Sequence, residues 1–311
     1  MFIVKFRKLF YLIAVVMMGV AVFGLSKYGL NIGIDFKGGA DLQVAWQAIS
    51  GEIEGEEIAA PAIIVLPGLD EVRAAVEPLG LEARIRPVGD NGYDIKTREL
   101  TDDERADLER VLRNIQPDGF EVVQFSSLGP ILGAETMRKS IWSIVFVMLC
   151  ICLFITFAFR QVSRPIKSWK YAMITLVTLT HDLVIPLGVY AFLGYYLGVE
   201  VDTLFVAAIL TVLGFSVHNT IVVFDRIRER LRHDHSANFE EVAGKSVMDT
   251  FARSMNTSFS TLMALFILFF IGGIAVRWFT LTLIVGVIVG TYSSVFLASP
   301  LLVTIYNWQK K

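Results

Sequence analysis

Residues 171–194 read YAMITLVTLTHDLVIPLGVYAFLG, a run in which only His181 and Asp182 can carry a full charge near neutral pH. A helix needs about 20 mainly apolar residues to cross the hydrocarbon core of a bilayer. This run therefore predicts a membrane-spanning helix. Asp182 lies about 11 residues, or roughly 16 Å, from the inner end of the helix, which places it near the middle of the membrane.

Five further apolar runs have a similar length, at residues 9–26, 138–159, 202–224, 255–274 and 278–303. Of the 311 residues 54% are hydrophobic, whereas soluble domains have about 45–50%. We predict a polytopic α-helical membrane protein with six transmembrane helices. The first run lacks a small-residue cleavage site, so we interpret it as a retained span rather than a cleaved signal peptide.

Positive charge predicts the orientation of the spans, because Lys and Arg gather on the cytoplasmic side. Fifteen of them lie in the tails and connections on one side of the six runs, and only Arg277 lies in the short connections on the other. Both termini are thus expected in the cytoplasm, with residues 31–130 outside. The predicted domains are residues 1–30 (first span), 31–130 (extracytoplasmic domain) and 131–311 (spans two to six).

The extracytoplasmic segment predicts an α+β ferredoxin-like domain of order βαββαβ. Expected strands lie at 40–48, 81–88, 93–97 and 120–125, and expected helices at 69–78 and after a capping box at Thr101–Glu104. An insert occupies residues 51–67, and Asp90–Gly92 predicts a hairpin turn. The segment contains no His, Cys or acid–base pair, so we predict a binding or lever element and not an enzyme.

Composition excludes several classes of site. The net charge of −2 gives no basic excess for nucleic acid. Cys150 and Cys152 lie within one apolar run, distant in sequence from any His, and are interpreted as packing residues. No metal or cofactor is predicted.

Polar residues at membrane depth are costly and mark candidate sites. Asn219 and Arg253 lie roughly 25 and 28 Å from the outer ends of spans four and five, so contact between them is geometrically allowed. We expect them to join His181 and Asp182 in a buried polar seam where spans three, four and five meet. Many Ser and Thr side chains in the spans are expected simply to bond their own backbone. One polar face of span five is expected to avoid lipid; it carries Arg253, Asn256, Thr257, Ser260 and Thr261.

Two further patterns concern packing. Gly286, Gly290 and Ser294 are spaced by four, which lets another backbone approach closely and indicates a tight bundle; we also expect this face to need a partner chain. Phe239, Val242, Ala243 and Val247 share one face of a short segment, which we interpret as lying on the inner membrane surface.

Several motifs in order resemble the SecD/SecF protein-export family, and in particular its SecF branch. The first is Gly33-Ile34-Asp35-Phe36-Lys37-Gly38-Gly39, directly after span one; the others are His181-Asp182, the stretch from Thr220 to Glu229, and Gly290-Thr291-Tyr292-Ser293-Ser294. The family belongs to the resistance-nodulation-division superfamily.

The resemblance implies a function that composition does not. It implies a subunit of the bacterial inner membrane that works with a SecD-like subunit beside the SecYEG channel, often with YajC. Together they would use the proton-motive force to assist late export of unfolded proteins. It places the family's proton-pathway Asp at position 219 and its partner Arg at Arg253.

At position 219 this chain has Asn, which cannot bind and release a proton near neutral pH. Three interpretations stay open: an engineered substitution, a role for His218 with its ordinary pKa of about 6.5, or loss of proton coupling. The second is least favoured, because His218 points about 100° away around the helix. The competing functions are a structural or chaperone-like export subunit and a small-molecule exporter of the same superfamily, for which the outer domain offers little room.

Overall fold

The computed structural model describes residues 2–46, 67–89, 91–117, 119–160, 166–233 and 238–310. The chain packs as two units, one made of residues 1–31 and 140–311 and the other of residues 32–139. Apart from Asn31, the residues expected outside the membrane fall in the second unit, which also holds the first turns of the following helix. Most of the expected insert at 51–67, and Asp90 of the expected turn, lie outside the described residues.

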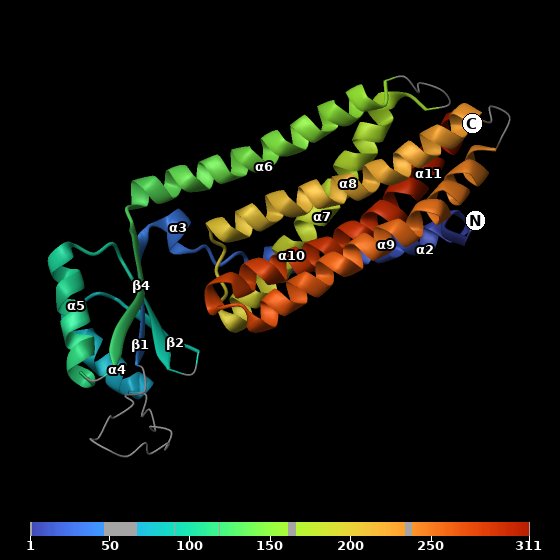
Figure 1. Cartoon of the computed structure of the whole chain (residues 1–311). Coiled ribbons are helices and arrows are strands. Elements are labelled where there is room, and N and C mark those ends of the chain that lie inside the picture. The colour runs from blue at the N-terminus through green and yellow to red at the C-terminus, as the bar shows by residue number, and fades with distance from the viewer. Residues whose placement is uncertain are drawn as a thin grey trace, which may run out of the picture. The chain divides into compact units, whose positions relative to one another are not determined.

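Within the described residues, six long apolar helices can span a membrane by length and composition, which confirms the predicted number (Figure 1). Five are continuous: α2 (Arg7–Tyr28), α6 (Pro130–Ala158), α7 (Ser168–Leu197), α8 (Thr203–His233) and α9 (Phe239–Ile271). The sixth is built from α10 (Ile274–Tyr292), the π-helical turn η2 (Ser293–Ala298) and α11 (Ser299–Lys310). A short helix, α1 (Phe2–Lys5), precedes α2.

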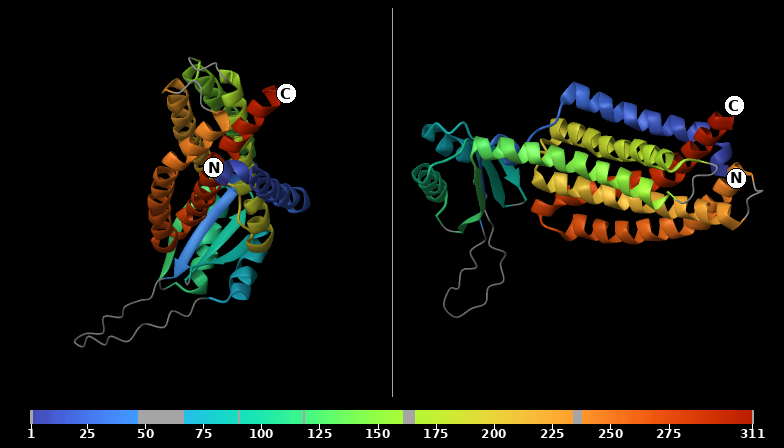
Figure 2. Two further views of the ribbon diagram at one scale, coloured as in Figure 1. Left: turned by 90° about the vertical axis from the view of Figure 1, so that its right-hand side faces the viewer. Right: turned by 90° about the horizontal axis from the view of Figure 1, so that it is seen from above.

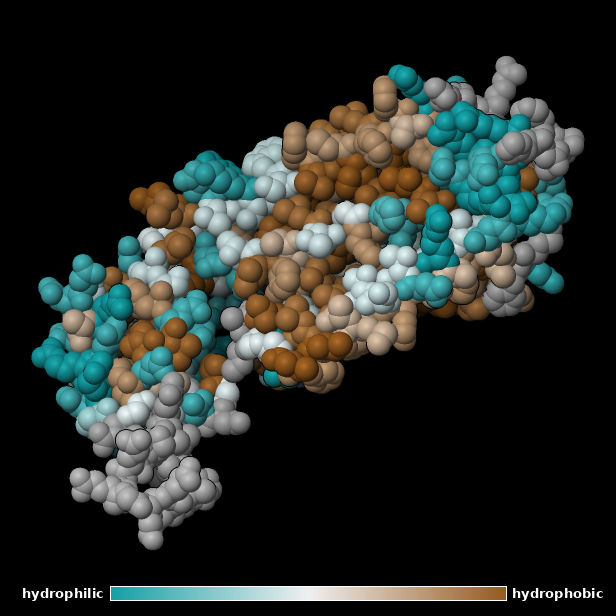
Figure 3. Space-filling model, in the orientation of Figure 1, coloured by the Kyte–Doolittle hydropathy of each residue, from teal (hydrophilic) through white to brown (hydrophobic). Residues whose placement is uncertain are grey.

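The helical unit has the surface of a membrane protein. Apolar side chains cover its middle, and hydrophilic residues gather at the end that carries both termini (Figures 2 and 3). Large apolar side chains on α2, α6 and α9 are exposed, among them Val15, Phe146 and Phe270. In water such a surface would drive aggregation, whereas in a bilayer it meets lipid or a partner's helices.

The interior of this unit corrects one sequence-based interpretation. The segment expected on the membrane surface is the first part of α9, and the helix runs without a break to Ile271. Phe239, Ala243 and Val247 are almost fully buried in the main apolar core of the unit. Their amphipathic spacing therefore reflects burial against neighbouring helices and not contact with lipid headgroups.

In the part that the structure describes, the second unit has a four-stranded antiparallel sheet of order β2-β3-β1-β4 together with helices α4 and α5. Its elements are β1 (Gly39–Trp46), α4 (Leu69–Val76), β2 (Arg84–Val88), β3 (Gly92–Thr97), α5 (Asp102–Ile115) and β4 (Phe120–Leu128), with the short 3-10 helix η1 (Glu77–Leu79) after α4. This order confirms the ferredoxin-like prediction. The core contains Trp46, Ile95, Leu108 and Leu112, all fully buried. β2 begins later than expected, since Glu82 has a left-handed φ of 48° that interrupts an extended strand.

Local chemistry fixes the start of α5. The Thr101 hydroxyl accepts a bond from the Glu104 N–H, while the Glu104 carboxylate accepts one from the Thr101 N–H at 3.0 Å, which confirms the capping box. Arg98 also pairs with Glu104. Hydrogen bonds from Arg98 and then from the Thr101 backbone lower the pKa of Glu104 to about 2.

The glycine motif after span one forms the segment that leads into strand β1 of this sheet. Gly33 precedes the short helix α3 (Ile34–Lys37), and Phe36 is buried. Gly38 and Gly39 then take positive φ angles of 80° and 134°. A Cβ on Gly38 would lie 2.7 Å from the backbone of Pro130, so only glycine fits where β1 begins beside the start of α6. Asp35 is half-buried on α3.

Candidate functional site

Asp182 lies inside the helical unit with no exposed surface. It sits on α7 beside His181, which is 2% exposed. Nδ1 of His181 is 3.0 Å from Oδ1 of Asp182. A carboxylate at this depth is stable only where other groups replace its lost water.

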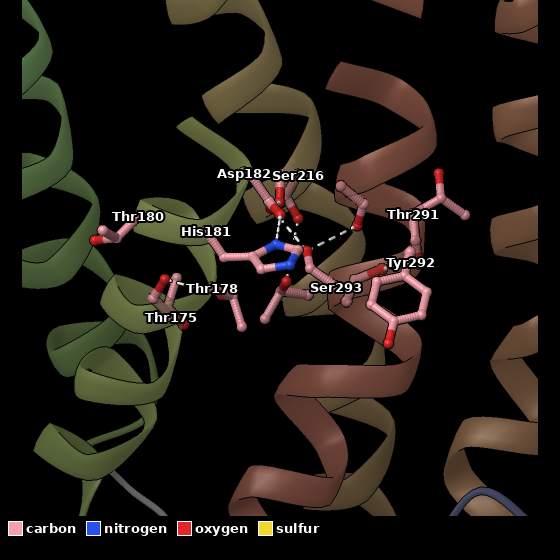
Figure 4. A network of polar contacts seen from close by, with 12 residues as sticks. Thr175, Thr178, Thr180, His181, Asp182, Ser216, Thr291, Tyr292 and Ser293 are labelled. Carbon is pink, nitrogen blue, oxygen red and sulfur yellow. Dashed lines mark hydrogen bonds and ion pairs between the residues drawn. The ribbon is translucent and has the colours of Figure 1, made fainter. Parts of the chain in front are cut away.

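Two hydroxyls from other helices supply that replacement. Ser216 on α8 donates to Oδ2 of Asp182, and Ser293 at the start of η2 donates to the same oxygen at 2.7 Å (Figure 4). With His181, three groups therefore converge on one carboxyl group. This arrangement can hold a carboxylate anion, and it ties α7, α8 and η2 to the ionisation state of Asp182.

The helix carrying Ser293 extends the site toward α2. The Tyr292 ring stacks beside the His181 ring, with centroids 6.3 Å apart. Its hydroxyl donates to the backbone oxygen of Phe10 on α2 at 2.7 Å. Tyr292 therefore links the Asp182 site to α2. That helix continues along the chain into the segment before the sheet unit.

Asn219 lies one helical turn beyond Ser216 on α8. It is 2% exposed, and its Nδ2 has no hydrogen-bond partner among the described residues. It therefore lies close to the Asp182 contact made by Ser216, but within the described residues it makes no hydrogen bond to the Asp182 carboxylate. His218, the next residue back, has an exposed side chain and turns away from this interior.

The prediction that Arg253 belongs to the buried polar seam is wrong. Its side chain is exposed on α9, where it lines a cleft of about 430 Å³ with Asp225, Glu229 and Asp249. Arg226 and Arg230 bind Asp249 in this region, whereas Arg253 makes no ion pair within the described part of the chain. The buried site is thus formed by spans three, four and six, and span five contributes neither Arg253 nor a bond to Asp182.

The polar face of span five is likewise outward. Asn256, Thr257 and Ser260 are exposed in this single chain, and buried Ser258 instead bonds Thr291 of α10 at 2.6 Å. Other hydroxyls follow the simpler expectation and bond their own helix. Thr175 donates to the Tyr171 carbonyl and Thr220 to the Ser216 carbonyl.

The small-residue stripe of span six is satisfied inside the chain. A Cβ on Gly286 would overlap the Val212 side chain, and one on Gly290 would lie 3.0 Å from Cβ of Ser216. Ser294 is fully buried. The predicted tight packing is correct, whereas the expectation that this face needs a partner chain is wrong.

Sequence reasoning missed Ser216 and did not assign Ser293 to the site. Serine is common in spans, and depth gives a position along a helix axis without its facing direction. The sequence carried one signal for Ser216: it lies three residues before Asn219, so both side chains fall within one turn of α8. Among the described residues no group of three or more His, Cys, Asp or Glu side chains could hold a metal.

Residues 107–308 match the family model for protein export membrane protein SecD/SecF, C-terminal. The chain belongs to the SecD/SecF family. Among its relatives, the protein translocase subunit SecF of Thermobaculum terrenum is 36% identical over 99% of this chain and 94% of that protein. The SecF of Vibrio alginolyticus is 30% identical over 96% of this chain and 87% of that protein.

Solved structures of the SecD/SecF family share this fold. The crystal structure of SecDF from Thermus thermophilus, a translocon-associated membrane protein, matches with a TM-score of 0.79 and 27% identity. A SecDF in a super-membrane-facing form matches with a TM-score of 0.63 and 28% identity. The match covers 99% of this chain but 38% of the Thermus chain, so this chain spans about two fifths of that protein.

Proposed function

We propose that this chain is an accessory subunit of the Sec protein-export machinery that, with a SecD-like subunit, uses the proton-motive force to assist late translocation of unfolded proteins. Family membership and the names of the relatives support the export role. One observation carries the proposed energy coupling: the fully buried Asp182 carboxyl, held by hydroxyls from two other helical segments.

Protonation of Asp182 would change the bonds between these helices. The ionised carboxylate accepts from Ser216 and Ser293, whereas a protonated carboxyl is itself a donor and leaves one oxygen a weaker acceptor. The preferred arrangement of α7, α8 and η2 therefore depends on the proton. Tyr292 carries that dependence to Phe10 on α2, and we propose that α2 passes it along the chain to the sheet unit.

The face of α9 with Arg253 supports a membrane partner. Arg253 is an unpaired cation within the described residues, and Asn256 and Ser260 lie exposed on the same helix. Charged and polar residues on a spanning helix normally face a partner or a water-filled cavity rather than hydrocarbon. We propose that spans of the SecD-like subunit cover this face and place an acceptor opposite Arg253.

The orientation completes the proposal. Fifteen Lys and Arg residues lie in the tails and in the connections on the same side of the six spans as both termini, which supports cytoplasmic termini in a bacterial inner membrane. Residues 31–130 then lie outside, where the sheet unit grips or releases the emerging client. The remaining proposed partners are the SecYEG channel and YajC.

A second candidate is a structural or chaperone-like export subunit with no proton coupling of its own. Asn219 favours it, because this side chain cannot replace a titrating Asp. Asp182 favours coupling, since a buried carboxyl is expensive to keep without a role. A small-molecule exporter is less favoured, because the relatives that match nearly the whole chain are named as protein translocase subunits.

The decisive experiment compares two carboxylates of this chain in the reconstituted complex. Purified chain, a SecD-like subunit and SecYEG are placed in proteoliposomes, and late translocation is measured with and without a proton gradient. Asp182→Asn is expected to remove the stimulation by the gradient. Glu241→Gln is the matched control, since the Glu241 side chain is 43% exposed, pairs with Lys245 and does not line the cleft that contains Arg253. Unchanged stimulation in Asp182→Asn rejects coupling through this site and favours the second candidate.

A further inference from the structure

A cleft of about 610 Å³ lies at the start of the first span, outside the Asp182 site. It is lined by both apolar and charged side chains: Val4, Lys5, Phe6, Arg7, Lys8, Leu9 and Glu240. Its volume is in the range of small-molecule sites. Most of its lining belongs to residues 4–9, around the start of α2, and both termini lie at this end of the helical unit (Figures 1 and 2).

Contacts with the rest of the helical unit hold one side of this cleft in place. Ile3 and Val4 of α1 are buried in the main apolar core, which holds this short helix against the bundle. Arg7 pairs with Glu240 of α9 at 3.2 Å, and Asn307 of α11 donates to the same carboxylate. Three helices therefore fix the position of Arg7, and the carboxylate of Glu240 is already occupied.

The positive charge of the cleft is not balanced. Lys5 and Lys8 are exposed and make no ion pair within the described parts of the chain. Lys5 instead lies over the Phe6 ring at 6.0 Å. With Glu240 offsetting Arg7, two lysine charges remain at the level where the apolar helix α2 begins.

We propose that this cleft binds the phosphate headgroup of an anionic phospholipid from the surrounding bilayer. Lys5 and Lys8 would hold the phosphate. Phe6 and Leu9, which are 42% and 50% exposed, would contact the upper part of the acyl chains. Two lysine cations beside exposed apolar side chains at the start of a span match an anionic lipid better than a soluble anion. A soluble anion would gain nothing from contact with Phe6 or Leu9.

Titration of the purified full chain with phosphatidylglycerol or phosphatidylcholine, followed by native mass spectrometry, tests the site. Each lysine near an anionic surface contributes roughly a fivefold gain in affinity, so Lys5→Gln/Lys8→Gln should bind phosphatidylglycerol about 30-fold more weakly. The matched control is Lys167→Gln/Lys170→Gln, which removes the same charge beside the start of α7, away from the cleft; it should change binding by about twofold at most.

Each other outcome has a defined meaning. Equal losses of affinity in both double variants would overturn the site, because binding would then depend on total surface charge. Equal affinity for the two lipids would also overturn it, because binding would then not depend on the charge of the headgroup. Displacement of phosphatidylglycerol by excess inorganic phosphate would identify a soluble anion site and also reject the lipid. If Lys5→Gln/Lys8→Gln loses helix content, Lys5→Arg/Lys8→Arg provides the test, and it must keep the binding of the unmodified chain.

Discussion

The hydroxyl of Ser293 lies 2.7 Å from Oδ2 of Asp182, although 111 residues separate them in the chain. Ser293 is the first residue of a π-helical turn, a feature that is rare and is often found at functional sites. The contact makes the end of span six part of a site whose charged residue belongs to span three. Function and stability are therefore expected to depend on the same carboxyl group.

Asp182→Ala should lower the free energy of unfolding by about 3 kcal/mol, because each buried donor left without an acceptor costs about 1–3 kcal/mol. The change removes the carboxylate that contacts Ser216, Ser293 and Nδ1 of His181, although the Ser293 hydroxyl keeps a second acceptor, the Gly290 carbonyl at 3.2 Å. Reversible unfolding in mixed micelles measures it. Thr211→Ala is the control, since Thr211 is exposed and bonds only the Ala207 carbonyl of its own helix; it should cost about 0.5 kcal/mol or less. Similar values for the two variants would contradict the site.

Tyr292→Phe removes one hydroxyl and keeps the ring that stacks beside His181. Losing the bond to the Phe10 carbonyl should cost about 1 kcal/mol in unfolding free energy. If Tyr292 transmits the state of Asp182 to α2, the same variant should also reduce the stimulation of translocation by a proton gradient. A variant that is less stable by this amount but fully stimulated would show that the hydroxyl is structural only.

Asn219→Asp separates the two candidate functions. If this chain takes part in proton coupling, adding a carboxyl one turn from Ser216 should increase the dependence of translocation on the gradient. If the chain is an uncoupled structural subunit, the substitution should leave that dependence unchanged. The control is Asn114→Asp, which adds the same group at an exposed position on α5. An equal response to both substitutions would mean that position 219 has no special role.

The sequence predicted much of the fold because its signals are local or periodic. Apolar length identified six spans, alternation and turn residues identified the βαββαβ order, and the spacing of Thr101 and Glu104 identified a capping box. The site was predicted only in part. The depth of Asp182 along its span predicted that it is buried, and it is. Depth cannot say which way the Arg253 side chain points. Arg253 faces outward, and Ser293 replaces it through a contact that no local pattern encodes.

Packing across the small-residue stripe provides a third stability test. Gly286→Ala should destabilise the chain by about 2 kcal/mol, because the new Cβ would overlap the β-branched and therefore stiff side chain of Val212. Gly214→Ala is the control, since a Cβ there has open space around it; its stability should be equal or slightly higher. Adding Val212→Ala to Gly286→Ala should recover part of the loss. No recovery would mean that the clash lies elsewhere.

Acid should loosen the start of α5 in the sheet unit, and Glu104 gives the reason. Hydrogen bonds from Arg98 and from the Thr101 N–H lower the pKa of Glu104 from 4.5 to about 2. A group whose pKa is depressed in the folded state stabilises it above the unfolded pKa, and this contribution is lost as pH falls through the folded value. Protection of α5 from hydrogen exchange, corrected for intrinsic rates, should therefore fall between about pH 4.5 and 2 in the full chain. Glu104→Gln should start with lower protection and lose this pH dependence. Glu109→Gln, which leaves the capping box intact, should keep it, and identical profiles for the two variants would contradict the assignment to Glu104.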